Sequence, residues 1–392
     1  MNDFISILIS FILMNLADSV DSFFNNSISI DAIIVCGSLI FINFLTRSIG
    51  EVGIYTYRVI RKNELAYLFI TGIVSFFLGL MIFINRNLIV NLFSLTIEQK
   101  NLLSGVLSIY ILYLPTTLLN YGILEAIRLK SNLKLYRMGL IIYYFFLIGL
   151  DLLFLVLYHN LILLFVATIL ANLISFLYLL YKSKFKFNFP AKDELNNIKK
   201  YGVVLCLERI ISRIFILIYG ILASNLGTKK YAIHSVCYSI CLNLEIITNA
   251  YSAALMIKIP EAKSKIEQDL IMKEYMKKCF LIVLIFNFAL SFINLVISHG
   301  SLPFLDCFPY IFFYSLAMFG LYPYESYKAL CVIQGKPKIL LTGSIIGVIV
   351  RILICLIFIK TPLNLYIFAI ANLIDFFVRS LIYKHSIKIK DS

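Results

Sequence analysis

The chain has 392 residues, of which 61% are hydrophobic and only 14% are charged, and its mean hydropathy is +0.93. Soluble globular domains of ordinary composition are much less apolar, so the composition excludes a soluble protein and predicts an integral membrane protein. The net charge of +14 would suit a nucleic-acid partner, but the basic residues gather in the connections between apolar stretches, which argues against that partner.

Apolar stretches follow one another along the whole chain. A helix needs about 20 apolar residues to cross a hydrocarbon core of roughly 30 Å, and twelve stretches reach that length. We therefore predict an all-α membrane protein with twelve transmembrane helices. In chain order, the predicted spans cover residues 4–24, 29–55, 65–85, 101–126, 138–158, 160–181, 201–225, 231–257, 279–298, 303–327, 338–359 and 362–383.

The second half of the sequence repeats features of the first half. The tetrapeptide Ala-Asn-Leu-Ile at 171–174 returns at 371–374, a shift of 200 residues, and the basic turns at 127–134 and 331–338 are 204 residues apart. These correspondences predict two six-helix lobes that are pseudo-repeats of one another. Because six spans return the chain to its starting side, the axis that relates the lobes runs along the membrane normal.

A polar segment separates the first six spans from the second six. It contains Pro190 and a cluster of lysines. We therefore expect an N-terminal six-helix lobe at residues 1–183, a cytoplasmic linker at 184–200 and a C-terminal six-helix lobe at 201–392.

A second polar stretch, at residues 260–278, joins the eighth and ninth predicted spans. Ile266, Leu270, Ile271 and Tyr275 recur in it at helical spacing among lysines, which is typical of a short helix at a membrane interface. A solvated loop accounts for this composition equally well, so two interpretations stay open.

Basic residues are distributed unevenly between the two sides of the membrane. Of the 35 Lys and Arg residues, 26 lie beside span ends on the side of the N-terminus, 5 lie on the other side and 4 lie within spans. Because basic loops stay in the cytoplasm, both termini are predicted to be cytoplasmic. The abundance of Ile, Lys, Asn, Phe and Tyr suits a bacterial plasma membrane.

Two carboxylates in the first predicted span are the main candidates for ion coupling. Asp18 and Asp21 are three residues apart, which places both on one face of a helix. Two carboxylates that are close together in a low dielectric need a partner. Either one of them binds a proton, or the pair binds a cation such as Na⁺, which prefers oxygen ligands. The alternative is that Asp21 is hydrated near the outer end of the span.

Four other ionisable residues are expected near the middle of predicted spans, namely Asp151, Glu245, Arg351 and Asp375. A charged residue at this depth costs about 2.5–3.5 kcal/mol on insertion scales, so it marks either a functional site or a structural ion pair. One interpretation pairs Arg351 with Glu245 or Asp375. The other places these residues in a substrate cavity.

The seventh predicted span begins with three charged residues, Glu208, Arg209 and Arg213. The two arginines are four residues apart and share a helical face. They are candidates for contact with an anionic substrate group or a lipid headgroup, although long basic side chains also extend to the membrane interface. All three residues are assigned to the candidate substrate cavity.

Asn172 and Asn372 occupy matching positions in the sixth and twelfth predicted spans. A hydrogen bond between helices explains such a carboxamide. A second interpretation makes Asn172 an ion ligand near Asp21, so Asn172 is also a candidate coupling residue.

Sequence signals of a soluble enzyme are absent. We find no GxxxxGK[ST] nucleotide loop, no HExxH and no GxSxG, and no segment outside the predicted spans is long enough for a catalytic domain. We therefore expect no enzyme activity, no cofactor apart from Na⁺ or H⁺ as a coupling ion, and no metal site apart from Na⁺ at Asp21.

At several places the sequence resembles the multidrug and toxic compound extrusion (MATE) family. Val20-Asp21-Ser22-Phe23-Phe24 resembles the first-helix aspartate of that family, and Leu150-Asp151-Leu152-Leu153 resembles its fifth-helix signature. The start of the family's eighth helix is similar to Tyr231-Ala232-Ile233-His234. Span one lacks the proline that is often associated with bending in the family.

The resemblance implies two six-helix lobes, alternating access, and export coupled to sodium or protons, with Asp21 as the coupling carboxylate and Asn172 nearby. We therefore predict a monomeric antiporter in the lipid bilayer that exports small amphiphilic molecules, among them organic cations. The alternative function is a flippase for a lipid-linked saccharide or cell-wall precursor, which would need cationic residues in its cavity. A third hypothesis is an assembly protein without transport activity.

Overall fold

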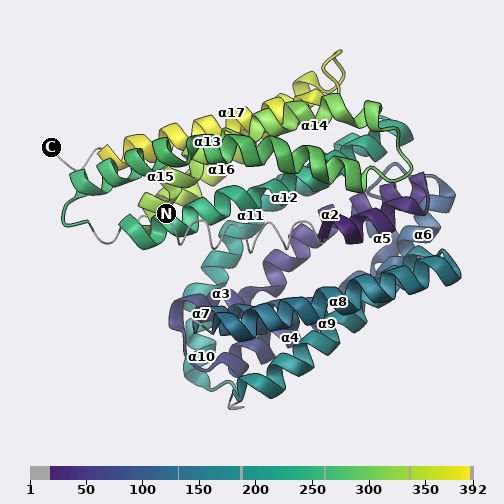
Figure 1. Ribbon diagram of the computed structural model, residues 1–392, viewed down its shortest axis with the longest axis horizontal. Coiled ribbons are helices and arrows are strands. Elements are labelled where there is room, and N and C mark those ends of the chain that lie inside the picture. The colour runs from purple at the N-terminus through teal and green to yellow at the C-terminus, as the bar shows by residue number, and fades with distance from the viewer. Residues whose placement is uncertain (1–17, 131, 186–188, 260–261, 335–336, 389–392) are drawn as a thin grey trace. The chain divides into compact units, whose positions relative to one another are not determined.

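The computed structural model describes residues 18–130, 132–185, 189–259, 262–334 and 337–388 (Figure 1). Every regular element in these ranges is a helix. After a helix at residues 18–27, the first half of the chain contains α2 (Ile30–Gly50), α3 (Val52–Ile60), α4 (Glu64–Ile84), α5 (Arg86–Val90), α6 (Ile97–Ser108), α7 (Tyr110–Leu129), α8 (Leu133–Tyr158) and α9 (Leu161–Ser183).

The second half of the chain begins with a short helix that continues into a long one. Its elements are α10 (Lys192–Asn197), the π-helical turn η1 (Ile198–Gly202), α11 (Val203–Ser224), α12 (Thr228–Lys258), α13 (Lys265–Ser298), α14 (Phe304–Met318), α15 (Leu321–Ile333), α16 (Pro337–Phe358) and α17 (Tyr366–Lys388).

Helix ends follow from local sequence. The Ser29 hydroxyl accepts a hydrogen bond from the Ala32 backbone N–H at 3.0 Å and so begins α2. Thr96 and Gln99 form a capping box that begins α6. Between α8 and α9, His159 adopts the left-handed conformation and the Asn160 side chain caps α9. These caps satisfy backbone groups that a membrane cannot solvate.

Helices long and apolar enough to cross a membrane account for most of the described chain. There are eight of them among the described residues, or nine if α6 and α7, which are bent by 55° at Ile109, form one span. The protein is therefore a multi-pass membrane protein, as its composition predicts. The first predicted span, 4–24, lies mostly outside the described residues, so the number twelve stays a prediction.

The polar stretch at 260–278 differs from both interpretations given for it. Ser264 caps a helix of 34 residues that runs without a break from Lys265 to Ser298. The lysine-rich residues are therefore the first turns of the predicted ninth span. Neither a separate interfacial helix nor a loop is present over 265–278. The Ser264 cap and the continuous helical spacing of the apolar residues explain this result.

Two compact units divide the helices between them. We call Phe24–Thr228 the N-unit, and Met1–Phe23 together with Lys229–Ser392 the C-unit. In the N-unit, α4 packs along α7, α8 packs along α9, and α2 packs against α11. In the C-unit, α17 packs against α14, α15 and α16. These units describe packing, and the division of the sequence into pseudo-repeat lobes at 184–200 stays a prediction.

Candidate functional site

A buried ion-pair triad lies in the C-unit. Asp375 of α17 accepts a hydrogen bond from Arg379 Nε at 2.6 Å, and its other oxygen pairs with Arg351 Nε of α16. The side chain of Asp375 is 0% exposed, and those of Arg351 and Arg379 are 3% and 4% exposed. The structure therefore selects Asp375, one of the two predicted candidates, as an ion-pair partner of Arg351.

Aromatic rings and a glycine enclose this triad. The Arg351 guanidinium lies 4.9 Å from the Phe376 ring centroid, and that of Arg379 lies 5.7 Å from the Tyr324 ring centroid. Gly347 of α16 provides the space, because a Cβ atom at this position would overlap Asp375 Oδ1 and Arg379 Nε. This packing encloses the triad, so the triad has a structural role and is not open to a ligand.

The sequence interpretation missed Arg379, which it counted among the cytoplasmic basic residues. The signal that could have found it is spacing, since Arg379 follows Asp375 by four residues on one helical face. Glu245 of α12 lies in the same unit, and Tyr238 is within electrostatic range of both Glu245 and Arg351.

A second group of arginines lies in the N-unit around Tyr55 of α3. We call Arg47, Arg58, Arg209 and Arg213 the arginine group. Arg58 lies 5.6 Å from the Tyr55 ring centroid, and Arg209 and Arg213 are within electrostatic range of the Tyr55 side chain. The four residues come from α2, α3 and α11, whose mutual packing brings them together.

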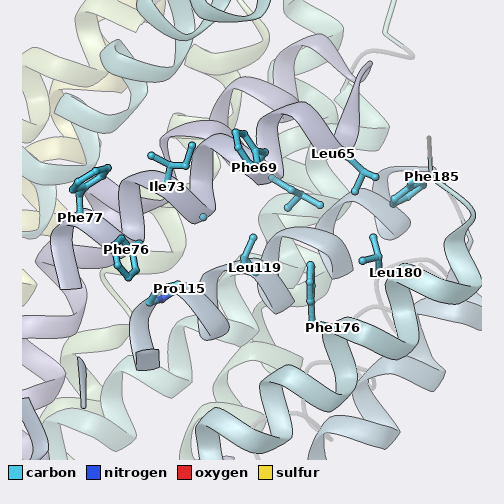
Figure 2. A pocket seen from close by; sticks show the side chains of 12 residues that line it. Leu65, Phe69, Ile73, Phe76, Phe77, Pro115, Leu119, Phe176, Leu180 and Phe185 are labelled. Carbon is cyan, nitrogen blue, oxygen red and sulfur yellow. The ribbon is translucent and has the colours of Figure 1, made fainter. Parts of the chain in front are cut away.

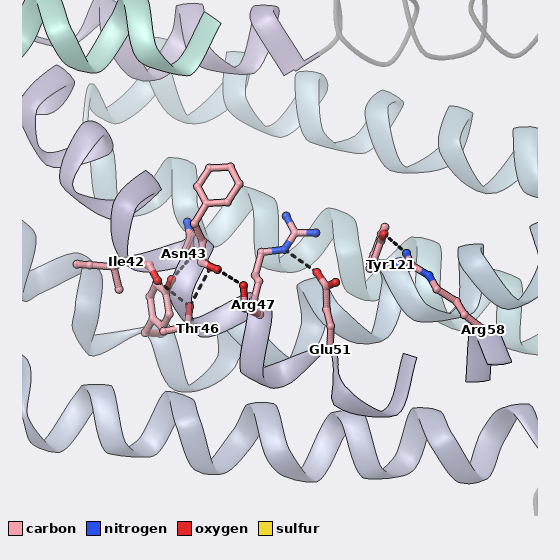
Figure 3. A network of polar contacts seen from close by, with 10 residues as sticks. Ile42, Asn43, Thr46, Arg47, Glu51, Arg58 and Tyr121 are labelled. Carbon is pink, nitrogen blue, oxygen red and sulfur yellow. Dashed lines mark hydrogen bonds and ion pairs between the residues drawn. The ribbon is translucent and has the colours of Figure 1, made fainter. Parts of the chain in front are cut away.

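Ion pairs and hydrogen bonds hold the first two members of the arginine group (Figure 3). Arg47 Nε lies 3.4 Å from Glu51 Oε1, one turn along the chain. Arg58 donates to Glu125 of α7 at 2.9 Å and to the Tyr121 hydroxyl at 2.7 Å. The side chains of Arg47 and Arg58 stay 37% and 29% exposed, so these side chains are more accessible than those of the triad.

Arg209 and Arg213 are half-buried on α11, and the guanidinium of Arg213 lies 5.0 Å from the Phe44 ring centroid. Of the three charged residues that begin this predicted span, Glu208 also lies in α11, but its side chain is outside the described part of the structure. The sequence analysis did not include Arg47, Glu51 or Arg58 among its candidate site residues. The spacing of four between Arg47 and Glu51 was an available signal.

Asn172 lies in a hydrogen-bonded cluster between α7 and α9. Its Oδ1 accepts from Asn120 at 3.0 Å, and its amide group donates to the Thr168 carbonyl at 2.9 Å and to the Thr117 hydroxyl at 3.4 Å. The predicted hydrogen bond between helices is present, and its partner on α7 is Asn120. Asn172 and Asp21 belong to different units, so their predicted proximity stays a prediction.

The remaining predicted carboxylates occupy two places. Asp151 of α8 is fully buried in the N-unit, in a helix that packs along α9. Asp18 and Asp21 lie in the helix at 18–27 and are half-buried. Between them, the hydroxyl of Ser19 donates to Asn294 Oδ1 of α13 at 2.9 Å, which attaches this part of the helix to the C-unit.

The described residues contain neither a cluster of metal ligands nor a disulfide. Within the described residues, no three His, Cys, Asp or Glu side chains gather closely enough to hold a metal ion. The eight cysteines are free thiols, seven of them buried. The chemistry that the described sites offer is therefore charge recognition rather than covalent chemistry.

Similarity to known proteins is visible in the fold and not in the sequence. No protein-family model matches the chain, and no curated protein matches it either. The inward-facing conformation of a multidrug resistance MATE family transporter of the MOP superfamily aligns with a TM-score of 0.75 and 15% identity, over 98% of this chain and 99% of that one.

Two other solved structures align over similar lengths. A MOP superfamily transporter from Pyrococcus furiosus Vc1, for which reverse polarity of the binding pocket suggests a different function, has a TM-score of 0.70 and 14% identity over 98% of this chain and 94% of that one. The crystal structure of MATE in complex with MaL6 has a TM-score of 0.70 and 14% identity, over 98% of this chain and 95% of that one.

The fold is that of a helical membrane transporter. More particularly, it is the fold of MATE transporters of the MOP superfamily over almost the whole chain, which confirms the predicted resemblance at the level of the fold. At about 15% identity, substrate and coupling ion do not transfer with the fold.

Proposed function

We propose that the protein is a secondary active transporter that moves amphiphilic molecules with an anionic group across the membrane by alternating access. The transporter fold supports the first part of this proposal. The arginine group of the N-unit carries the second part, because two of its side chains, those of Arg47 and Arg58, are held by ion pairs and stay partly exposed. Ionisable residues in membrane spans are expensive and are retained where they bind or couple.

The cations of the arginine group suggest the substrate class. Its four guanidinium groups lie around Tyr55, and Glu51 and Glu125 are the carboxylates that Arg47 and Arg58 contact. Arginine binds phosphate oxygens through two parallel hydrogen bonds, which gives both strength and orientation. A lipid-linked saccharide or cell-wall precursor, with its phosphate groups and polyprenyl chain, fits these requirements better than an organic cation does.

The substrate polarity within this fold is not fixed. The transporter from Pyrococcus furiosus is described as having a binding pocket of reverse polarity. That description supports the interpretation that some proteins with this fold transport cationic substrates and others transport anionic ones. Substrate polarity depends on the residues of the site and not on the fold.

Coupling to Na⁺ or H⁺ belongs to the same proposal. Asp21, together with Asp18, is the proposed ion site, and the ion drives transport only if it binds the two conformations with different affinity. The proposal also includes twelve spans in two lobes, a linker at 184–200, cytoplasmic termini and a monomer in a bacterial plasma membrane.

Export of organic cations is the second candidate function. The carboxylates of Asp18, Asp21 and Asp151 favour it, because a buried or half-buried carboxylate attracts a cationic substrate as readily as a coupling ion. In this function the arginine group would have only a structural role.

Transport in proteoliposomes separates the two functions. We would measure movement of a fluorescent polyprenyl-diphosphate saccharide and of ethidium, each under an imposed Na⁺ or H⁺ gradient. The variants are Arg213→Gln, Asp21→Asn and, as a matched control for loss of a basic residue, Lys100→Gln, whose half-buried side chain donates a hydrogen bond to Asn91.

Anionic transport predicts that the saccharide moves and that Arg213→Gln slows it about tenfold or more, since a hydrogen bond to a charged group contributes about 1.5–3 kcal/mol. Lys100→Gln should transport like the native chain. Asp21→Asn should remove the dependence on the gradient. Movement of ethidium alone, with Arg213→Gln at the native rate, would replace this proposal by cation export.

A further inference from the structure

An apolar groove crosses the surface of the N-unit between α4, α7 and α9 (Figure 2). Its volume is about 650 Å³. Phe69, Phe76 and Phe77 of α4 form one wall, and Phe176 and Leu180 of α9 form the opposite side. The phenylalanines of α4 are exposed in the folded unit, so the groove is open to whatever surrounds it.

The length of the groove matches one leaflet of a bilayer. It extends along α4 from Leu65 to Phe77, which is about 18 Å at a rise of 1.5 Å per residue. Half of the hydrocarbon core is roughly 15 Å. Gly72, which has no side chain, and Pro115 lie along this length.

A polar pocket of about 550 Å³ adjoins one end of the groove, and Phe185 lines both. Lys130 and Lys184 enter this pocket together with Glu64, Asn63 and other side chains from the ends of α4, α7 and α9. The groove and the pocket therefore form one continuous amphipathic site, with an apolar channel and a polar, basic end.

The charges at this end favour an anion. The Lys130 ammonium lies 2.6 Å from Glu64 and 4.7 Å from the Phe185 ring centroid, which fixes its position beside the mouth of the groove. Lys184 is exposed at the end of α9, in a left-handed conformation that directs the chain away from the helix. Two cations and one carboxylate leave the pocket with a net positive charge.

Neighbouring residues extend this positive charge. Arg61 and Lys62 come just before α4, and Lys182 comes two residues before Lys184. By the distribution of basic residues, this end of the spans is predicted to lie at the cytoplasmic face, where the leaflet contains anionic lipids.

We propose that the N-unit binds an anionic phospholipid of the cytoplasmic leaflet, with one acyl chain in the groove and the phosphate between Lys130 and Lys184. This site is separate from the proposed substrate and ion sites and does not depend on the transported molecule. A lipid that binds only the folded N-unit stabilises it. Because the site selects anionic lipids, the stability of the protein depends on lipid charge.

The test is retention of lipid by the purified full-length chain. We would reconstitute the chain in an equal mixture of phosphatidylglycerol and phosphatidylcholine, extract it in detergent, and count retained lipids by native mass spectrometry. The double variant Lys130→Gln/Lys184→Gln removes the basic end, and Lys100→Gln, at a half-buried lysine elsewhere in the N-unit, is its control.

The native chain should retain phosphatidylglycerol over phosphatidylcholine. The double variant should lose this preference, by about fivefold for each lysine, since a basic residue near anionic headgroups contributes about that factor. Lys100→Gln should behave as the native chain does. Equal retention of both lipids by the native chain, or an unchanged preference in the double variant, would overturn the proposal.

The groove itself is tested by a bulky residue. Ile73 lines the groove with an exposed side chain, so Ile73→Trp should block the acyl chain while leaving the core intact. Leu112 is also exposed but does not line the groove, so Leu112→Trp is the matched control. We expect Ile73→Trp to reduce retained phosphatidylglycerol at least threefold. Retention at the native level in Ile73→Trp contradicts a lipid in this groove.

Discussion

The buried triad of the C-unit and the arginine group of the N-unit use the same side chain in different surroundings. In the triad, two guanidinium groups share Asp375, and the three side chains are at most 4% exposed. In the arginine group, Arg47 and Arg58 are held by one carboxylate each and stay 37% and 29% exposed. A buried charge network fixes the packing of helices, whereas a partly exposed one is available to a ligand.

The largest effect should follow the loss of the shared carboxylate in the triad. Asp375→Asn leaves two buried guanidinium groups without their anion, and breaking a buried pair in this way costs about 3–5 kcal/mol. We expect a large fall in the melting temperature in detergent and poor expression. Asp269→Asn is the matched control, because Asp269 forms an exposed pair with Lys273 in the same unit. Similar melting temperatures for the two variants would contradict a structural triad.

Overpacking at Gly347 should have the next largest effect. In Gly347→Ala the added methyl group overlaps Asp375 Oδ1 and Arg379 Nε, and overpacking of this kind typically costs about 1–3 kcal/mol. Gly149→Ala is the control, since a Cβ atom at this position of α8 meets no atom within 4 Å. Thermal unfolding of both variants should show destabilisation of the first and no loss of stability in the second.

Removal of Arg58 should affect stability less than either change in the triad. Arg58→Gln loses the pair with Glu125, but Arg128 also pairs with Glu125 at 2.7 Å and keeps that carboxylate neutralised. We expect a loss of about 1 kcal/mol or less, the range of partly exposed pairs. If thermal unfolding shows a loss as large as in Asp375→Asn, the two groups of arginines do not differ as we infer.

The smallest effect concerns a carboxylate outside the membrane spans. The Asn63 side chain donates a hydrogen bond to Glu194 of α10, which holds the pKa of this carboxyl below its ordinary value of 4.5. A lowered folded-state pKa stabilises the protein above the ordinary value, and this contribution is lost as the pH falls through the folded-state pKa. Glu194→Gln should therefore melt slightly below the native chain at pH 7.

The difference between Glu194→Gln and the native chain should shrink as the pH falls from about 4.5, the ordinary value, through the lower folded-state pKa, because the ionised carboxylate loses its advantage over this range. Melting curves at both pH values measure this change. A difference that grows toward low pH would contradict the hydrogen bond to the ionised carboxylate.

Sequence reasoning located some of these charges and missed others for identifiable reasons. Arg351 and Asp375 were expected at mid-membrane depth because each lies in the middle of an apolar stretch, and the two alternatives for the partner of Arg351 differed only in tertiary placement. Arg379 was assigned to the membrane surface because it lies near the end of its stretch. In the structure it is buried, since α14, α15 and α16 pack around α17.

The arginine group shows more clearly which contacts local sequence does not indicate. Its members come from three helices, and Arg58 pairs with Glu125 across 67 residues of sequence. Spacing within one helix could have indicated the pair of Arg47 and Glu51. Nothing in the local sequence indicates that Arg209 and Arg213 of α11 lie near Tyr55 of α3.

The sequence by itself determined that this is a multi-pass helical membrane protein, because the length of an apolar stretch and the cap of a helix are properties of one continuous segment of chain. It also supported the resemblance to MATE transporters, which the fold confirms. Only the tertiary structure decided which charges pair, which are enclosed and which stay accessible, because ion pairs and grooves form between helices that are distant in sequence. Burial follows from that packing, and burial separates the triad of the C-unit from the arginine group of the N-unit.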